Sequence, residues 1–430
     1  MKRLYLKEFS LIILTALCVN LISCASGSFA VSGSGTVPED FFGITPERYN
    51  LNSRGFGILD EFNAVWIRDT IRWSGVERGE GNWIFDSWDG YIADAEAAGK
   101  KIVLVLGFDN PWLYPEKKER RDFTDSELPH FLMYIEKVVT RYKTRVVYEI
   151  WNEPNWHFWK GSDENFFRVS AAAAKRIKEL VPAAVVLAGS TSRFDKKFTR
   201  GMFLAGAMEH TDGFAVHPYG TSPADTMRQV DNLKKVYDEF NYDKPIWITE
   251  AGYSTGPVSF CNIKQYPEYI VKTLSGLSAR ADMVRHIIWY ELIDEYNAGE
   301  VKNYLDPLNY FGLAFPDGTY KNGAEAFMLT AHYLAGSKYN SELPIRENVS
   351  RNVTSLYFIK DDGTGVLIIW NDGLGKKKIS LSIAGAENIS SHNIVNREVS
   401  PMQENTILNV GREPLFITWK AGKPPKLGSK

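Results

Sequence analysis

The sequence predicts an α/β chain: a (β/α)8 TIM barrel followed by a small C-terminal antiparallel β-sandwich. First, short apolar runs alternate with helix-like segments about eight times. Second, these runs are mostly continuous and rich in Val, Ile, Trp and Tyr, as in strands buried on both faces of a parallel sheet. Third, no helical period follows about Ser337. A doubly wound open sheet is the alternative, but no glycine-rich phosphate-binding fingerprint supports it.

The barrel strands are expected where the apolar runs lie. They are Phe41–Thr45, Ala64–Thr70, Lys101–Phe108, Val146–Glu153, Ala184–Gly189, Gly213–Pro218, Pro245–Glu250 and His286–Leu292. Helical spacing of apolar residues predicts the segments between them. These helices are Asp86–Gly99, Thr124–Tyr142, Glu164–Leu180, Ala224–Phe240, Tyr266–Asp282 and Ala324–Leu334.

The C-terminal strands alternate apolar and polar residues, as in a half-buried antiparallel sheet. In the third of them, Ile379, Leu381 and Ile383 alternate with serines. Asp361-Asp362-Gly363 is a hairpin-turn signal, and we expect the polar tail after Ala421 to be frayed. The predicted strands are Ser355–Lys360, Val366–Trp370, Lys378–Ile383 and Leu415–Lys420.

Composition limits the possible partners. The 430 residues are 44% hydrophobic and 24% charged, which is ordinary for a globular protein. Fifty Lys and Arg stand against 52 Asp and Glu, a formal net charge of −2. Because nucleic-acid-binding proteins normally carry a basic excess or patch, no nucleic-acid partner is predicted.

The N-terminus predicts export. A basic start precedes the apolar run Leu11–Ser23, which has the length of a signal peptide. Leu21-Ile22-Ser23-Cys24 looks like the lipobox of bacterial lipoproteins, so we expect lipidation of Cys24 and membrane contact only through that lipid anchor. The alternative is ordinary cleavage after Ser28-Phe29-Ala30, which would make the product periplasmic or secreted. The expected divisions are a signal peptide (1–24), a flexible tether (25–37), the barrel (38–337) and the sandwich (338–430).

Two glutamates mark the chemistry. Glu153 and Glu250 follow the fourth and seventh predicted strands, and reactive groups of a (β/α)8 enzyme stand at such strand ends. Paired carboxylates at a barrel mouth suit glycosidic cleavage, which needs one acid and one carboxylate that attacks or stabilises the sugar centre. The structural alternatives are a polar turn residue before Pro154 for Glu153 and a helix N-terminal carboxylate for Glu250.

A family resemblance lies in the same segments. Val147–Asn155, followed by Phe158–Gly161, resembles glycoside hydrolase clan A, and most of all family 39, the β-xylosidase and exopolysaccharide-cleaving group. The segment from Ile67-Arg68-Asp69 through Trp73-Ser74, together with Glu77 to Trp83, resembles the second strand and its loop in that family. The resemblance covers about residues 40 to 335. Ala251-Gly252-Tyr253 departs from the bulkier polar continuation usual in xylosidases, so the substrate is left open.

The resemblance implies roles for individual residues. Glu153 matches the acid/base, and Glu250 matches the nucleophile of a retaining, double-displacement mechanism. Asn152 matches the asparagine that hydrogen-bonds the sugar 2-hydroxyl, and Arg68 matches the arginine that contacts the nucleophile. His217 and Tyr219 match the His-x-Tyr pair at strand six. Trp289 matches the aromatic platform under the reacting sugar.

Each binding assignment has a structural alternative. Arg68 could pair with its neighbour Asp69, and the residues His217, Tyr219 and Trp289 could be satisfied core side chains. Sugar rings stack on aromatic side chains, so three loop tryptophans are candidates for a substrate cleft or, equally, for loop anchors. They are Trp112, Trp156 and Trp159.

The predicted function is an exported retaining glycoside hydrolase that cleaves β-glycosidic bonds in an oligo- or polysaccharide. No cofactor is implied, and no metal site is expected, since the chain has 7 His and no His-x-x-x-His motif. Two alternatives remain. One is a transglycosylase that uses the same two glutamates, and the other is a non-catalytic surface carbohydrate-binding protein.

Overall fold

The computed structural model describes residues 35–46, 55–114, 116–295, 305–340, 345–347 and 349–429. The predicted signal peptide (1–24), Cys24 and most of the predicted tether lie outside these residues. The last tether residues belong to the folded body, because Thr36 forms a bridge with Lys338 and Val37 is buried. Within the described ranges, none of the helices has the length and apolarity needed to cross a bilayer.

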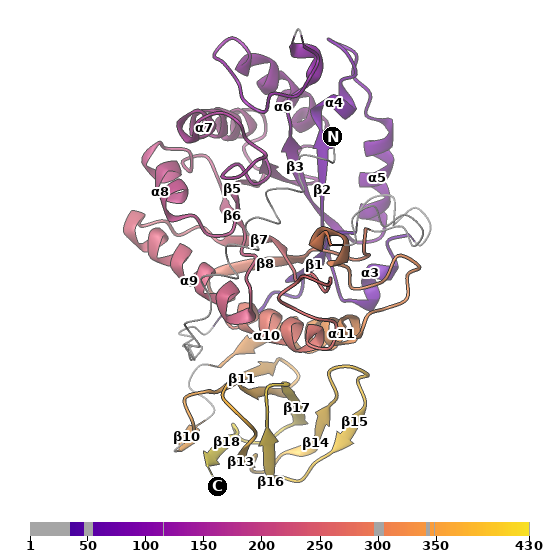
Figure 1. The fold of residues 1–430 in the computed structure, drawn as a ribbon, viewed down its shortest axis with the longest axis vertical. Coiled ribbons are helices and arrows are strands. Elements are labelled where there is room, and N and C mark those ends of the chain that lie inside the picture. Colours follow the sequence, from indigo (N-terminus) through magenta and orange to yellow (C-terminus); the bar gives the residue numbers. More distant parts are fainter. Residues whose placement is uncertain are drawn as a thin grey trace.

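Eight parallel strands close into a barrel in sequence order, which confirms the predicted fold class. Figure 1 shows helices surrounding these strands. The strands are β1 (Phe42–Ile44), β2 (Trp66–Arg72), β3 (Lys101–Gly107), β4 (Val147–Ile150), β5 (Val186–Ser192), β6 (Gly213–His217), β7 (Ile246–Ala251) and β8 (Val284–Trp289).

The barrel strands are apolar on both faces because each face meets a different core. Side chains of a strand alternate between the two faces. One set fills the barrel interior, and it includes Trp66, Val103, Trp247 and Ile288. The alternate set packs outward against the helices, as Ile287 does.

Six of the described helices around the barrel fall on the predicted segments, and the three shortest were not predicted. The helices are α3 (Ile58–Glu61), α4 (Trp73–Val76), α5 (Asp86–Ala97), α6 (Leu128–Tyr142), α7 (Asp163–Leu180), α8 (Lys196–Leu204), α9 (Pro223–Phe240), α10 (Tyr266–Ser278) and α11 (Asn322–Leu334), with the 3-10 turns η1 (Pro111–Leu113) and η2 (Pro307–Tyr310). Side-chain caps define several starts: Ser162, Asp195 and Ser222 each accept a backbone N–H in the first turn.

Two largely antiparallel sheets follow the barrel, as predicted, and one edge pair of the four-stranded sheet is parallel. One has the order β10-β18-β13-β16, and the other has the order β15-β14-β17-β12-β11-β9. The strands are β9 (Ser337–Tyr339), β10 (Ile345–Glu347), β11 (Val353–Lys360), β12 (Gly365–Asn371), β13 (Lys377–Ser382), β14 (Glu387–His392), β15 (Val399–Pro401), β16 (Asn405–Val410), β17 (Leu415–Lys420) and β18 (Lys426–Ser429).

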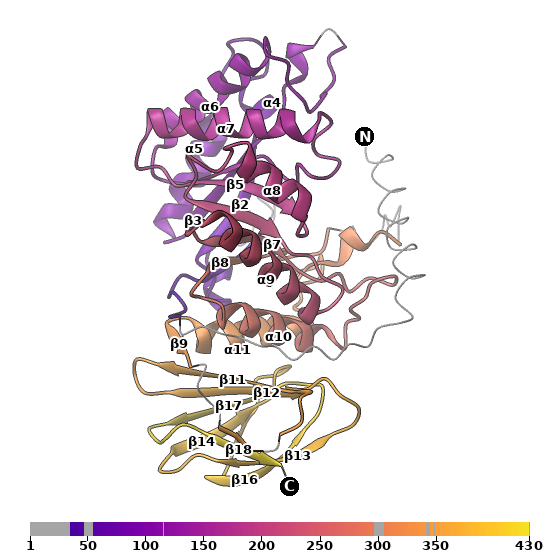
Figure 2. The same ribbon diagram turned by 90° about the vertical axis from the view of Figure 1, so that its left-hand side faces the viewer.

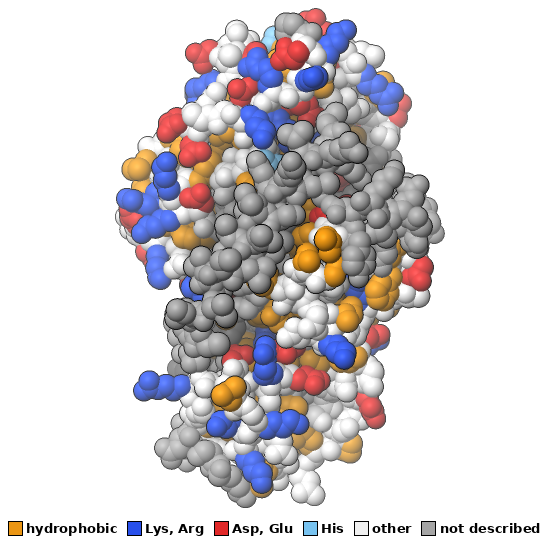
Figure 3. All heavy atoms as spheres, viewed as in Figure 1, with side chains coloured by type: hydrophobic (Ala, Val, Ile, Leu, Met, Phe, Trp, Pro, Cys, Tyr) orange, Lys and Arg blue, Asp and Glu red, His pale blue; other side chains and the backbone are white. Residues whose placement is uncertain are grey.

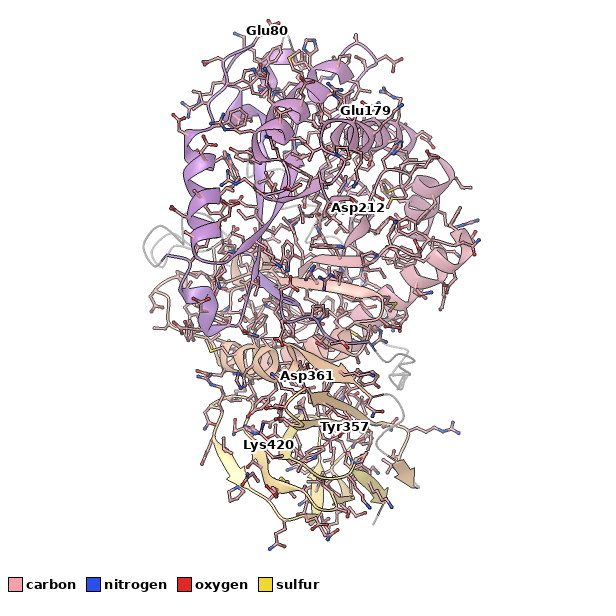
Figure 4. The ribbon with its side chains drawn as sticks, turned by 180° about the vertical axis from the view of Figure 1, so that it is seen from behind. Glu80, Glu179, Asp212, Tyr357, Asp361 and Lys420 are labelled. Atoms are coloured by element: carbon pink, nitrogen blue, oxygen red, sulfur yellow. The ribbon has the colours of Figure 1, made fainter. Side chains whose placement is uncertain are left out.

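The sandwich has its own apolar core between its two sheets. Inside it, the rings of Tyr357 and Trp419 stack at 5.5 Å. Figure 4 labels Tyr357, Asp361 and Lys420 on the sandwich, well separated from the labelled barrel residues Glu80, Glu179 and Asp212. The expectation of a frayed tail is wrong, because β18 pairs with both β10 and β13.

The six-stranded sheet also packs against the barrel's last helices. Figure 2 shows α10 and α11 lying between the barrel and the sandwich. Phe358 and Phe416 of the sheet share one apolar cluster with Phe327 of α11. Lys272 of α10 reaches across and donates to Asp372 Oδ1 at 2.9 Å. The two parts are therefore joined by a continuous core as well as by the chain.

On the face shown in Figure 3, blue and red side chains are interspersed over the described surface of both parts. No stripe of a single charge is visible there. This distribution matches the near-neutral composition of the chain.

Candidate active site

Polar side chains from several strands meet at the carboxyl ends of the barrel strands. Arg68 comes from β2, Glu149 from β4 and His217 from β6, while Glu250 comes from β7. Arg68 points inward because it is two residues beyond Trp66, which lies in the barrel interior. In a (β/α)8 barrel, this end of the strands is where active sites lie.

The two glutamates that the sequence singled out lie side by side. Glu153 and Glu250 are 6% and 9% exposed. One carboxylate oxygen of Glu153, one carboxylate oxygen of Glu250 and one ring nitrogen of His217 all lie within 4.8 Å of one another. Glu153 reaches this position through a tight turn after β4, in which both Trp151 and Glu153 have positive φ angles. Positive φ is costly for residues other than glycine, so the surrounding structure holds the turn in place.

Arg68 holds several of these groups together. Its Nη1 donates to Glu250, and its Nη2 donates to Asn152 Oδ1 at 2.7 Å. Its Nε donates to Glu149 Oε2 at 2.8 Å, while Nη2 also reaches Glu149 Oε1 at 3.1 Å. Burial disfavours its charge, but Glu149 and Glu250 outweigh that effect and raise the pKa of Arg68. Asp69, the alternative partner, instead accepts the backbone N–H of Thr70.

His217 is fully buried beside both glutamates. Its Nδ1 lies 3.1 Å from Glu153 Oε1 and 3.6 Å from Glu250 Oε2, and its Nε2 lies 3.1 Å from Thr249 Oγ1. Burial lowers its pKa, but Glu250, Glu149 and Glu153 outweigh burial and raise the pKa of His217 to about 9. The neighbouring carboxylates thus favour the protonated form of the ring, in which both nitrogens donate.

The same cluster bears on metal binding. The spacing of Glu153, His217 and Glu250 would suit a cation. However, the guanidinium of Arg68 already bonds Glu250. The expectation that the enzyme needs no metal stays a prediction.

Tyr219 completes the surroundings of Glu250. Its hydroxyl donates to Glu250 Oε2 at 2.6 Å. Burial and the neighbouring charge of Glu250 raise the pKa of Tyr219 well above its usual value, so the hydroxyl keeps its proton. Glu250 thus accepts one hydrogen bond on each oxygen, from Arg68 and from Tyr219.

Glu149 belongs to the same network, although the sequence analysis gave it no role. It is completely buried and accepts hydrogen bonds from Ser190, Thr249 and Arg68. Burial alone would raise its pKa, but Arg68 and His217 outweigh burial and lower the pKa of Glu149 to about 2. A glutamate within an otherwise apolar strand was the available signal, because buried carboxylates are rare unless paired.

Trp289 does not come to the site, because its side chain is on the other face of β8. Ile288 points into the barrel, so its neighbour Trp289 points outward. Trp289 is completely buried, donates to the hydroxyl of Tyr266 at 3.3 Å and packs on Phe327 of α11. The predicted platform at this position is therefore corrected to a packing role.

The next residue, Tyr290, directly follows β8 and is linked to Tyr219 through one ring. It is half-buried, and its ring lies 5.6 Å from Phe311, which in turn lies 5.8 Å from Tyr219. Tyr290, one position further along the chain, is therefore the better candidate for a ring at the site.

The loop tryptophans pack mainly against other rings. Trp159 is buried against Trp151 at 5.2 Å and donates to Ser162 O, which fits the loop-anchor alternative. Trp112 is half-buried and packs edge-on against Trp73 at 6.0 Å. Trp156 is half-buried in the turn directly after Glu153.

Comparison with known proteins agrees with this architecture. Residues 139–310 match the family model named glycosyl hydrolase catalytic core. No curated protein matches the chain significantly. The matched residues run from the end of α6 through β4, β6 and β7 and therefore include Glu153, His217 and Glu250.

Solved structures share the fold at low sequence identity. A family 39 glycoside hydrolase from Bacteroides cellulosilyticus WH2 is 19% identical, with a TM-score of 0.74 over 89% of this chain and 81% of that one. A monomeric β-xylosidase from Caulobacter crescentus CB15 is 13% identical, with a TM-score of 0.64 over 91% and 97%. The family 39 enzyme from Xanthomonas axonopodis pv. citri is 13% identical, with a TM-score of 0.62 over 93% and 100%. Together with the family match, these structures confirm the expected resemblance to clan A glycoside hydrolases and the expected enzyme class, a glycosidase.

Proposed function

We propose that this protein is a retaining glycosidase in which Glu250 is the nucleophile and Glu153 the acid/base. The observation that carries the proposal is the close approach of the two carboxylates: one oxygen of Glu153 lies within 4.8 Å of one oxygen of Glu250. Retaining glycosidases hold the carboxyl groups about 5–5.5 Å apart, whereas inverting enzymes leave roughly 6.5–9.5 Å for a water molecule. The spacing therefore favours direct attack by one carboxylate.

The contacts of each glutamate suit its proposed role. Glu250 attacks the anomeric carbon and forms a glycosyl ester while the bond to the leaving oxygen breaks. Glu153 gives its proton to that oxygen, and it later takes a proton from the water that hydrolyses the ester and frees Glu250. Arg68 and Tyr219 hold Glu250 in place for the attack.

Asn152 is oriented for a contact with the sugar. Its Oδ1 accepts from Arg68, so its amide hydrogens are turned away from Arg68. Asn152 is half-buried, and it directly precedes Glu153. We assign its amide to the hydroxyl next to the anomeric carbon, where hydrogen bonds strengthen in the transition state.

The proposed substrate is a β-linked oligo- or polysaccharide. Solved structures with this fold include proteins described as a glucosidase and as a β-xylosidase. β-Xylosides and β-glucosides are therefore the first substrates to test. The export signal and the lipid on Cys24 stay part of the proposal, and would place the enzyme at the cell envelope.

Proton NMR of the first product tests the mechanism. Double displacement predicts that a β-glycoside initially releases the β-anomer of the free sugar, which then equilibrates with the α-anomer. An α-anomer as the first product would overturn the assignment of Glu250 as nucleophile. Products longer than the substrate at high sugar concentration would favour transglycosylation, and binding of glycans without turnover would favour the non-catalytic alternative.

A further inference from the structure

Two chains of hydrogen bonds start at the buried carboxylate of Glu149. In the first, Arg68 donates to Glu149 and also to Glu250. In the second, Thr249 donates to Glu149 Oε1 at 3.0 Å and lies 3.1 Å from Nε2 of His217, whose Nδ1 lies 3.1 Å from Glu153. One carboxylate is therefore connected to both glutamates of the proposed mechanism.

Glu149 itself cannot touch a substrate. It is completely buried in β4, four residues before Glu153. A carboxylate without water is stable only when protein groups donate to it, and Arg68, Ser190 and Thr249 do so. Glu149 is thus a fixed anion beneath the reacting groups.

We propose that Glu149 is a positioning residue that orients both glutamates, Glu250 through Arg68 and Glu153 through Thr249 and His217. This inference rests on the proposed function. Glu149 takes no part in the proposed chemical steps. Its contacts account for the orientation of the Glu153 and Glu250 carboxylates toward each other.

The first branch works through the planar shape of the guanidinium. Nε and Nη2 of Arg68 both donate to Glu149, at 2.8 and 3.1 Å. Such a two-point contact fixes the plane of the guanidinium. Because the plane is fixed, Nη1 points at Glu250.

The second branch works through the single hydrogen of a hydroxyl. Thr249 gives that hydrogen to Glu149, so its oxygen can only accept from His217 Nε2. The ring is then held with Nδ1 toward Glu153. Without the anion, the hydroxyl could rotate and would no longer fix the ring.

The main test variant is Glu149→Gln, which keeps the shape of the side chain and removes the charge. The matched control is Glu77→Gln. Glu77 is also buried, and it accepts from Trp73 Nε1 at 2.6 Å and Gly81 N at 2.7 Å, away from both branches. Thr249→Val removes the hydroxyl link of the second branch and leaves the direct approach of His217 Nε2 to Glu149 Oε1 at 3.7 Å.

Kinetics on two leaving groups separate the branches. Phenyl β-xylosides and β-glucosides need a proton from the acid to leave, whereas their 2,4-dinitrophenyl counterparts leave without one. Thr249→Val should lower kcat/KM about 10- to 100-fold for the phenyl substrates. For the dinitrophenyl substrates, the loss of kcat/KM should be smaller by a factor of about ten. Glu149→Gln should lower kcat/KM on both, and Glu77→Gln on neither.

NMR titration of His217 gives a readout that does not depend on turnover. Three carboxylates face the ring, Glu149, Glu153 and Glu250, and Arg68 opposes them. Removing the charge of Glu149 should lower the pKa of His217 from about 9, and Glu77→Gln should leave it unchanged.

The proposal is overturned if folded Glu149→Gln keeps kcat/KM on both substrates within about twofold of Glu77→Gln. Should Glu149→Gln fail to fold, Thr249→Val decides: equal losses on the two leaving groups would contradict the separate branches. Failure of the proposed function looks different, because the wild type would then hydrolyse none of these glycosides, or activity would survive Glu250→Ala.

Discussion

At the scale of single residues, His217 makes stability depend on pH in a direction that can be worked out. Its pKa is raised from 6.5 in the unfolded chain to about 9 in the folded protein. Its contribution is therefore complete below pH 6.5 and is lost as the pH rises through 9. A shift of this size corresponds to on the order of 3 kcal/mol.

Urea unfolding of wild type and His217→Asn at pH values from 6 to 10 checks this dependence. We expect the difference in unfolding free energy between the two proteins to narrow as the pH rises toward 10. A difference that stayed constant, or that widened with pH, would show that the ring is not held as a cation.

At the scale of elements, the end of β8 places a packing residue, Trp289, next to Tyr290, a candidate ring at the site. Trp289 is completely buried against the helices, so Trp289→Ala should cost about 3–5 kcal/mol of stability. Tyr290→Ala should change stability less, because the side chain is half-buried, and should raise KM for aryl glycosides. Thermal unfolding together with kinetics of both variants tests the assignment, and a larger KM effect from a folded Trp289 variant would reverse it.

The difference between these two residues shows what the sequence could predict. The barrel strands could be predicted because buried strands appear as apolar runs in the sequence. Glu153 and Glu250 could be predicted because each is a charged residue at the end of such a run. The side of the sheet on which Trp289 lies was not visible, since a strand that is apolar on both faces gives no alternation to read.

Other misses have similar physical causes. α8 has only nine residues, and a short helix leaves a weak periodic signal. β18 is formed by a polar tail that pairs through its backbone, which side-chain type does not reveal. The role of Glu149 could not be predicted without knowing which strands lie near β4. Its partners Arg68, Ser190 and Thr249 come from three other strands.

At the scale of the whole molecule, the barrel and the sandwich should unfold together. Phe416 of β17 is completely buried in the apolar cluster that also contains α11. Phe416→Ala should cost about 3–5 kcal/mol and lower the melting temperature of both parts equally. Scanning calorimetry should show one transition in wild type and variant, whereas a separate, unchanged barrel transition would mean that the sandwich is an independent unit.

The account as a whole depends on Glu250 forming a bond to the sugar. A 2-deoxy-2-fluoro glycoside with a dinitrophenyl leaving group slows the release of the glycosyl ester, so the ester accumulates and can be located by peptide mass spectrometry. We predict a single label on the peptide that contains Glu250, and none in Glu250→Ala. A label on Glu153, or turnover of the reagent with inversion and no label, would contradict the proposed mechanism.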